Sequence, residues 1–127
     1  MKITDILAGE KPSLSFEVFP PKSGDAFDSV REVTEKIAAL HPSFMSVTYG
    51  AGGGTSAYTL EIAENLSAHG VTSLAHLTCV SSTKADIKAR LTALREAGIE
   101  NILALRGDIP AGDENREREY HYASELT

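Results

Sequence analysis

The chain has 127 residues, enough for one domain at most, and its apolar content of 42% is ordinary for a globular protein. Twelve basic and 18 acidic residues give a formal net charge of −6, which argues against a nucleic-acid partner, and a single cysteine excludes an internal disulfide framework or a cysteine-rich metal site. The apolar stretches are too short to cross a bilayer and the N-terminus lacks the order of a secretory signal, so we expect a cytoplasmic location with no membrane partner.

Four short runs rich in β-branched and apolar residues predict strands at 14–19, 44–49, 73–80 and 101–105. They recur about every 30 residues, the period of strand-helix units joined by right-handed crossovers. The only cysteine, Cys79, lies in the third run, where we expect it to be a small buried apolar residue.

Three helical patterns separate these strands. Their apolar residues at helical spacing are, in turn, Phe27, Val30, Val33, Ile37 and Leu40; Leu60, Ala63 and Leu66; and Ile87, Leu91 and Leu94. Pro42, Gly70 and Gly98 stand just beyond the three patterns, and residues 83–86 form a capping box before the third. The chain is therefore predicted to be a repeating strand-helix protein. Residues 123–127 resemble the first turns of another helix.

Alternation along the strands separates an apolar face from a polar one. The apolar set is Leu14, Phe16, Val18, Met45, Val47, Tyr49, Leu103 and Leu105, and the opposite set is Ser15, Glu17, Ser46, Thr48, Ala104, Arg106 and Asp108, with His76 and Thr78 sharing one parity. One apolar face and one face that turns polar toward the strand ends favour a barrel over a doubly wound sheet, which is buried on both faces.

Four strand-helix units do not close an eight-stranded barrel, so we interpret the chain as a truncated piece. An isolated half would expose an apolar inner face and two strand edges. We therefore expect it to be marginally stable, oligomeric or prone to aggregation by itself.

Glu17 is the first candidate for chemistry, because it interrupts the apolar run Ser15-Phe16-Glu17-Val18-Phe19 just before two prolines. Burying an ionised carboxylate costs several kcal/mol unless it is paired or neutralised. A functional acid would need a pKa raised by burial, so that it holds a proton near neutral pH. The alternative is a structural carboxylate paired with Arg106.

Arg106, Gly107 and Asp108 follow the fourth strand. Gly107 allows a ligand to approach the backbone and Asp108 supplies a negative charge, whereas the alternative is an ion pair between Arg106 and a neighbouring carboxylate. We expect His76 to be a hydrogen-bonding residue rather than a metal ligand. The glycine-rich segment 50–55 lacks both the P-loop lysine and the dinucleotide fingerprint, and leaves only a weak indication of anion binding at a helix N-terminus.

Four motifs in register together resemble methylenetetrahydrofolate reductase: SFEVFPPK at 15–22, SVTYGAGGGT at 46–55, AHLTC at 75–79 and LRGDIP at 105–110. The resemblance covers nearly the whole chain, from Leu14 to Leu126. It implies a (β/α)8 TIM barrel with non-covalent FAD, of which residues 1–127 are the N-terminal half of one reductase domain, about the first four βα units. It also implies that NADH or NADPH reduces the flavin, which then passes a hydride to 5,10-methylenetetrahydrofolate.

The resemblance assigns roles to individual positions. Glu17 matches the general acid that opens the folate ring, and Asp108 matches the aspartate beside flavin and pterin. The remaining flavin or nicotinamide positions are matched by Thr48, Tyr49, Ala51, His76, Arg106, Gly107, Tyr122 and Ala123. No metal is implied. A homotetramer is expected by analogy with the family, and the fragment alone is expected to be inactive or nearly so.

Two other interpretations stay open at this stage. The chain could be a non-catalytic barrel fragment that serves as an interaction element. It could also be another barrel enzyme, such as a hydrolase that uses Glu17 and Asp108 as paired carboxylates.

Overall fold

Four parallel strands form one sheet in the order in which they occur in the chain, β1 (Ser15–Val18), β2 (Phe44–Val47), β3 (Ser73–Thr78) and β4 (Asn101–Leu105). The structure is a computed structural model, and it describes residues 1–21, 24–49 and 56–127. The helices between the strands are α2 (Phe27–Ala38), α3 (Ser56–Ala68) and α4 (Lys84–Glu96). Short turns of helix complete the chain: α1 (Ile3–Leu7), η1 (Gly24–Ala26) and η2 (Ala123–Leu126).

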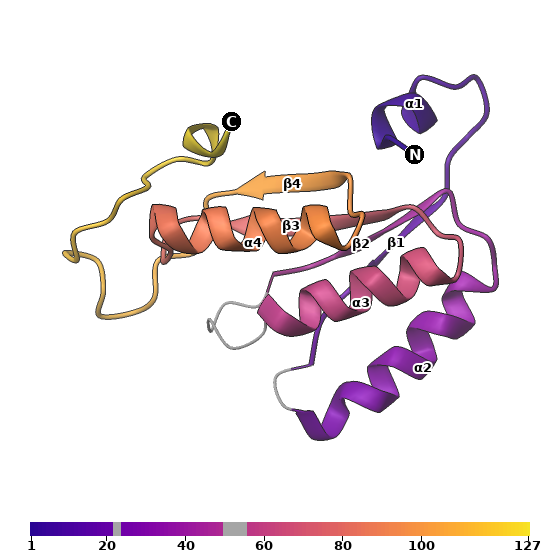
Figure 1. Cartoon of the computed structure of the whole chain (residues 1–127), viewed down its shortest axis with the longest axis horizontal. Coiled ribbons are helices and arrows are strands. Elements are labelled where there is room, and N and C mark those ends of the chain that lie inside the picture. The colour runs from indigo at the N-terminus through magenta and orange to yellow at the C-terminus, as the bar shows by residue number, and fades with distance from the viewer. Residues whose placement is uncertain (22–23, 50–55) are drawn as a thin grey trace.

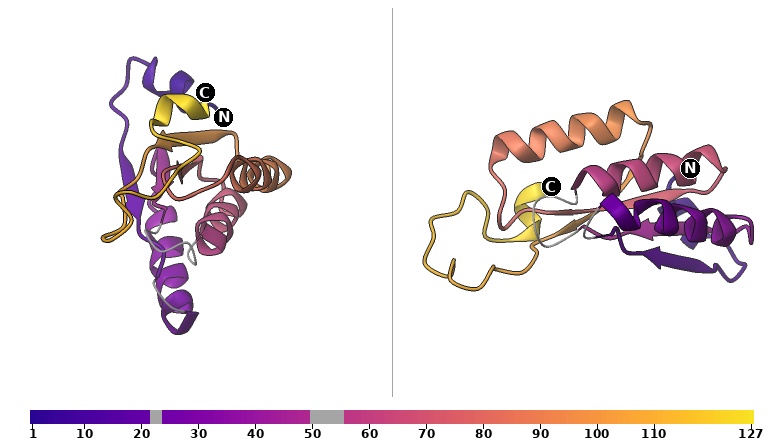
Figure 2. Two further views of the ribbon diagram at one scale, coloured as in Figure 1. Left: turned by 90° about the vertical axis from the view of Figure 1, so that its left-hand side faces the viewer. Right: turned by 90° about the horizontal axis from the view of Figure 1, so that it is seen from below.

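The strand order distinguishes the two predicted architectures. Each strand pairs only with its neighbours in the chain, and the connecting helices follow one face of the sheet (Figures 1 and 2). A doubly wound sheet would reverse direction after its first strands and place helices on both faces. The observed arrangement is that of the first βα units of a TIM barrel, as the sequence predicts.

The core lies between the sheet and its helices. Met45 and Val47 from β2 and Ala63 and Leu66 from α3 are fully buried there, together with Ile62. The predicted stripe of α2 is only partly correct, since Val33 and Leu40 are exposed whereas Thr34 is buried. Thr34 tolerates burial because its hydroxyl donates to the Val30 carbonyl at 2.7 Å, which satisfies the polar group within the helix.

The third predicted helix is confirmed at both ends. The Thr83 hydroxyl accepts from the Asp86 amide and the Asp86 carboxylate accepts from the Thr83 amide, which completes the capping box. Gly98 follows the helix with a φ of +74°, a left-handed conformation that favours glycine. Ile87 and Leu94 are buried on the sheet side. Cys79 is buried, as predicted, and burial raises the pKa of its thiol.

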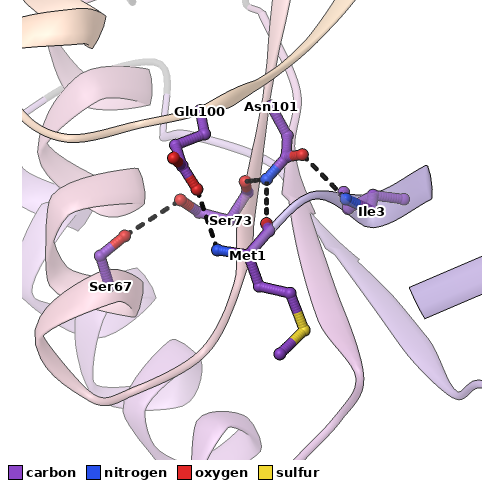
Figure 3. A network of polar contacts seen from close by, with 6 residues as sticks. All are labelled: Met1, Ile3, Ser67, Ser73, Glu100 and Asn101. Carbon is purple, nitrogen blue, oxygen red and sulfur yellow. Dashed lines mark hydrogen bonds and ion pairs between the residues drawn. The ribbon is translucent and has the colours of Figure 1, made fainter. Parts of the chain in front are cut away.

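The N-terminal segment, which the sequence did not identify as helical, is attached to the beginning of β4 (Figure 3). The Asn101 side chain accepts from the Ile3 amide at 2.9 Å and donates to the Met1 carbonyl at 3.0 Å. The Met1 ammonium group lies 2.9 Å from Glu100. These contacts join residues almost 100 positions apart and hold α1 against the amino ends of the strands.

The fourth strand corrects the predicted face assignment. Its register pairs Leu103 with His76 and Leu105 with Thr78, so both leucines share the face of Glu17 and Ser46 instead of the helix-covered face. Ala104 pairs with Leu77 and lies toward the helices. Alternation alone therefore does not bring Arg106 and Asp108 to the polar face.

The face of the sheet opposite the helices is open. Phe19 is 69% exposed and Leu103 39%, and β1 and β4 are edge strands. This agrees with the predicted exposure of an apolar inner face. Among the described residues, no helix combines the length and hydropathy needed to cross a membrane.

Candidate functional site

Glu17 lies on the open face of the sheet, between residues from the two neighbouring strands. Its Oε2 accepts a hydrogen bond from the Ser46 hydroxyl at 3.0 Å and lies 3.5 Å from Nε2 of His76. Ser46 and His76 are both buried, whereas the Glu17 side chain is 46% exposed. The carboxyl group is thus held at one oxygen while the group as a whole faces the open side, rather than being buried as the sequence suggested.

Burial lowers the pKa of the His76 imidazole, and the nearby Glu17 carboxylate opposes this shift. Its Nε2 has no hydrogen-bond partner among the described residues. His76 was predicted to form a hydrogen bond; its Nε2 lies near Glu17 but forms no hydrogen bond with it. Within the same part of the chain, no group of three acidic, histidine or cysteine side chains is placed to hold a metal.

A hollow of about 490 Å³ lies at the carboxyl ends of β3 and β4. Its walls come from the end of β2, the β3–α4 connection, α4 and the segment after β4, and they include Tyr49, Thr78, Ser82, Arg90, Arg106 and Asp108. A volume in this range is typical of small-molecule sites. Parallel-sheet enzymes bind ligands at this end of their strands.

Arg106 and Asp108 lie beyond the end of β4, so strand parity does not fix their positions, and both line the hollow. Gly107 has a φ of +83°, so the chain leaves the strand geometry immediately after Leu105. A Cβ at this position would lie 3.0 Å from the Cβ of Thr78, closer than side chains pack. Both alternatives proposed for Arg106 from the sequence are wrong, because among the described residues it pairs with no carboxylate and its Nε donates to the Gly107 carbonyl.

Arg90 also lines the hollow, although no motif in the sequence points to it. Its guanidinium donates to the Ser82 hydroxyl at 2.7 Å and lies 5.2 Å from the centre of the Tyr49 ring, a cation–π contact. It follows Ile87 by three positions on α4, so its helix face was visible in the sequence. The tertiary contact with the end of β2 was not.

The structure describes most, but not all, of the other predicted flavin positions. Thr48 continues the β2 ladder through its amide, which donates to Val18, and Ala51 lies outside the described residues. Tyr122 is 69% exposed, and its carbonyl accepts from the Cys79 thiol at 3.7 Å. That contact places the start of η2, with Ala123, beside the end of β3.

The N-terminus of α4 is not available to an anionic ligand. Besides its capping box, the Lys84 amide donates to the Glu119 carboxylate at 2.7 Å. The predicted anion site at the start of α3 involves residues 50–55, which lie outside the described part of the chain. Among residues 1–21, 24–49 and 56–127, the groups left to contact a ligand at this end of the sheet are those that line the hollow.

Comparison with known proteins gives a consistent result. A family model described as methylenetetrahydrofolate reductase matches residues 2–127. A probable methylenetetrahydrofolate reductase (NADH) from Oryza sativa subsp. japonica is 40% identical over 114 residues, which cover 89% of this chain and 19% of the rice protein. The 5,10-methylenetetrahydrofolate reductase of Escherichia coli (strain K12) is 34% identical over 115 residues, 90% of this chain and 38% of that protein. The chain thus spans less than two fifths of these relatives.

Proposed function

Because the chain belongs to the methylenetetrahydrofolate reductase family, we propose that it supplies the first part of the barrel of a flavoenzyme that reduces 5,10-methylenetetrahydrofolate with NADH or NADPH. Relatives from both plants and bacteria are named for this reduction. The single observation that supports the proposal best is the position of Glu17, an acid held at one oxygen on the face that a barrel encloses.

The hollow beside β3 and β4 fits a flavin. It combines an exposed guanidinium at Arg106, the aromatic side of Tyr49, and a glycine backbone at Gly107 that packs closely against Thr78. When bound there, FAD would accept a hydride from the nicotinamide and pass it to the folate. Arg106 and the backbone of residues 106–107 would hold the cofactor, and Asp108 would lie beside it.

Glu17 acts as the general acid in this proposal. It gives a proton to the leaving nitrogen of the folate's five-membered ring as the carbon–nitrogen bond breaks, and the electron pair of that bond stays on the nitrogen. The product is an iminium cation. Asp108 supplies a negative charge that stabilises this developing cation through space.

Replacing Glu17 by Gln tests the assignment in the protein encoded by the complete reading frame. The variant keeps the shape of the side chain and its acceptor for Ser46 but has no acidic proton. We expect reduction of the bound flavin by NADH to be unchanged, and the folate half-reaction to slow by about 10²–10⁴-fold, the usual contribution of a general acid. The same change at Glu64, an exposed residue of α3, is the matched control.

Loss of both half-reactions in the Glu17→Gln variant would contradict the role of Glu17 and indicate a structural one. Purified protein that contains no flavin and does not oxidise NADH with menadione as acceptor would contradict the function itself. Two further proposals rest on the family alone: assembly as a homotetramer and action in the cytoplasm.

The 127-residue chain alone is proposed to have little or no turnover, because the face that carries Glu17 is open to solvent. The exposure of Phe19 and Leu103 favours the second candidate function, an interaction element without catalysis. Equilibrium titration with FAD separates the two, since stoichiometric tight binding by the 127-residue chain would exclude the non-catalytic alternative.

A further inference from the structure

The contacts around Glu17 are concentrated on one of its two oxygens. Oε2 accepts from the Ser46 hydroxyl at 3.0 Å and faces Nε2 of His76 at 3.5 Å. Among the described residues, no donor is recorded for Oε1. The two carboxylate oxygens of this acid are therefore chemically distinct in the folded protein.

We propose that Ser46 and His76 are positioning residues that make Oε2 the carbonyl oxygen of the protonated acid and so place the acidic proton of Glu17 on Oε1, toward the substrate. This inference rests on the proposed function, in which Glu17 is the general acid. It assigns a role to Ser46, which the motifs did not identify. It also gives His76 a role toward Glu17 in addition to any contact with flavin.

The chemistry of a carboxylic acid supports this assignment. A protonated acid has one carbonyl oxygen, which accepts up to two hydrogen bonds, and one hydroxyl oxygen, which donates. Ser46 is a buried hydroxyl whose recorded partner is Oε2, so its donated hydrogen bond marks that oxygen as the acceptor. The proton then belongs on Oε1, the oxygen without a recorded donor.

His76 can strengthen the same preference. Its side chain is only 10% exposed, and its Nε2 has no formed hydrogen bond among the described residues, although it points to Oε2. An unprotonated Nε2 would set one lone pair against another, so we assign the proton of the neutral ring to Nε2. A shift of a few tenths of an ångström would then form a second donated hydrogen bond, as often happens when a site closes around its substrate.

The same two donors favour the reaction after the proton has moved. When the Oε1–H bond breaks and the proton joins the leaving nitrogen, Glu17 becomes a carboxylate. Hydrogen bonds to Oε2 stabilise that charge where it forms and need no rearrangement, which is how preorganised donors lower a barrier.

The test is the effect of Ser46→Ala on the separate half-reactions of the protein from the complete reading frame. We expect the folate half-reaction to slow by about 10–100-fold, as for a misplaced catalytic group, while NADH reduces the flavin at the wild-type rate. Ser73→Ala is the matched control, because Ser73 is also a buried strand serine with a hydroxyl partner, Ser67, at 3.1 Å. It should change neither half-reaction.

Three measurements keep the outcome decisive. In the Glu17→Gln background, Ser46→Ala should cause no further loss, since the hydroxyl acts only through Glu17, whereas additive losses would overturn the proposal. Ser46→Thr should restore the folate half-reaction and Ser46→Val should not, because the two differ in the hydroxyl at equal volume. Equal rates for this pair would also overturn it. If Glu17→Gln itself leaves the folate half-reaction intact, the proposed function fails instead.

Discussion

Replacing Gly107 by alanine should damage both the stability of the fold and the hollow, for two separable reasons. The first is the backbone, because a φ of +83° costs a residue with a Cβ about 1–2 kcal/mol. The second is crowding, because the new Cβ would lie 3.0 Å from the Cβ of Thr78 and 3.3 Å from a methyl group of Val80. Overpacking of this kind costs about 1–3 kcal/mol, so the expected loss in the free energy of unfolding is about 2–5 kcal/mol in total.

Gly112 provides the control that separates these reasons. It has a similar φ of +89°, but an added Cβ would meet no atom within 4 Å. Gly112→Ala should therefore cost only the backbone contribution of about 1–2 kcal/mol. Urea unfolding of both variants, made in the protein from the complete reading frame, measures the difference. FAD affinity should fall in Gly107→Ala and stay unchanged in Gly112→Ala.

The reasoning would be refuted by equal stability losses in the two variants. That result would mean that Thr78 and Val80 move aside at no cost, and that close packing between Gly107 and β3 does not shape the hollow. If Gly107→Ala is clearly destabilised but binds FAD with wild-type affinity, the packing argument holds and the hollow is not the FAD site.

Two further changes test features of the fold. Burial lowers the pKa of His76 from its ordinary 6.5. Between the folded pKa and 6.5 the unfolded state therefore binds more protons than the folded state. The free energy of unfolding should fall as pH falls through that window. His76→Gln should flatten this dependence in urea titrations across pH and the exposed His121→Gln should not; an unchanged slope in the first variant would contradict the assignment. Thr83→Ala should lower the free energy of unfolding by about 1 kcal/mol, because the α4 cap is lost. Thr92→Ala, in the interior of the same helix, should be neutral or stabilising. A Thr83→Ala variant as stable as wild type by thermal melting would contradict the capping argument.

The fold could be predicted where the sequence signal is local. The core side of β2 (Met45 and Val47), the capping box of α4 and the glycine after it each depend on a few adjacent residues, and each was found where expected. The open inner face follows from the alternation along the strands. The first three predicted strands extend one or two residues too far at their carboxyl ends, because pairing stops before the apolar pattern does, whereas the bounds of β4 agree.

The features that were missed depend on distant partners. Helix α1 has no buried residues of its own and is held by Asn101, which no pattern in residues 1–7 reveals. The face of β4 is set by its register with β3, so Leu103 and Leu105 were assigned to the wrong side. Ser46 is an ordinary polar residue in the sequence and becomes notable only because parallel pairing places it opposite Glu17.

The placement of the two acids weighs against the glycosidase alternative. Glu17 belongs to β1, the first strand of the sheet, and Asp108 follows β4, the last strand; three strand spacings correspond to roughly 14 Å on a flat sheet, which barrel curvature shortens. Asp108 lines the hollow, whereas Glu17 does not. Paired carboxylates of a glycosidase must face each other across one bond, at about 5–9.5 Å, and a pair of which only Asp108 lines the hollow does not support that alternative. Two acids on separate sides instead suit a site that protonates a substrate at one end and stabilises its cation from the other.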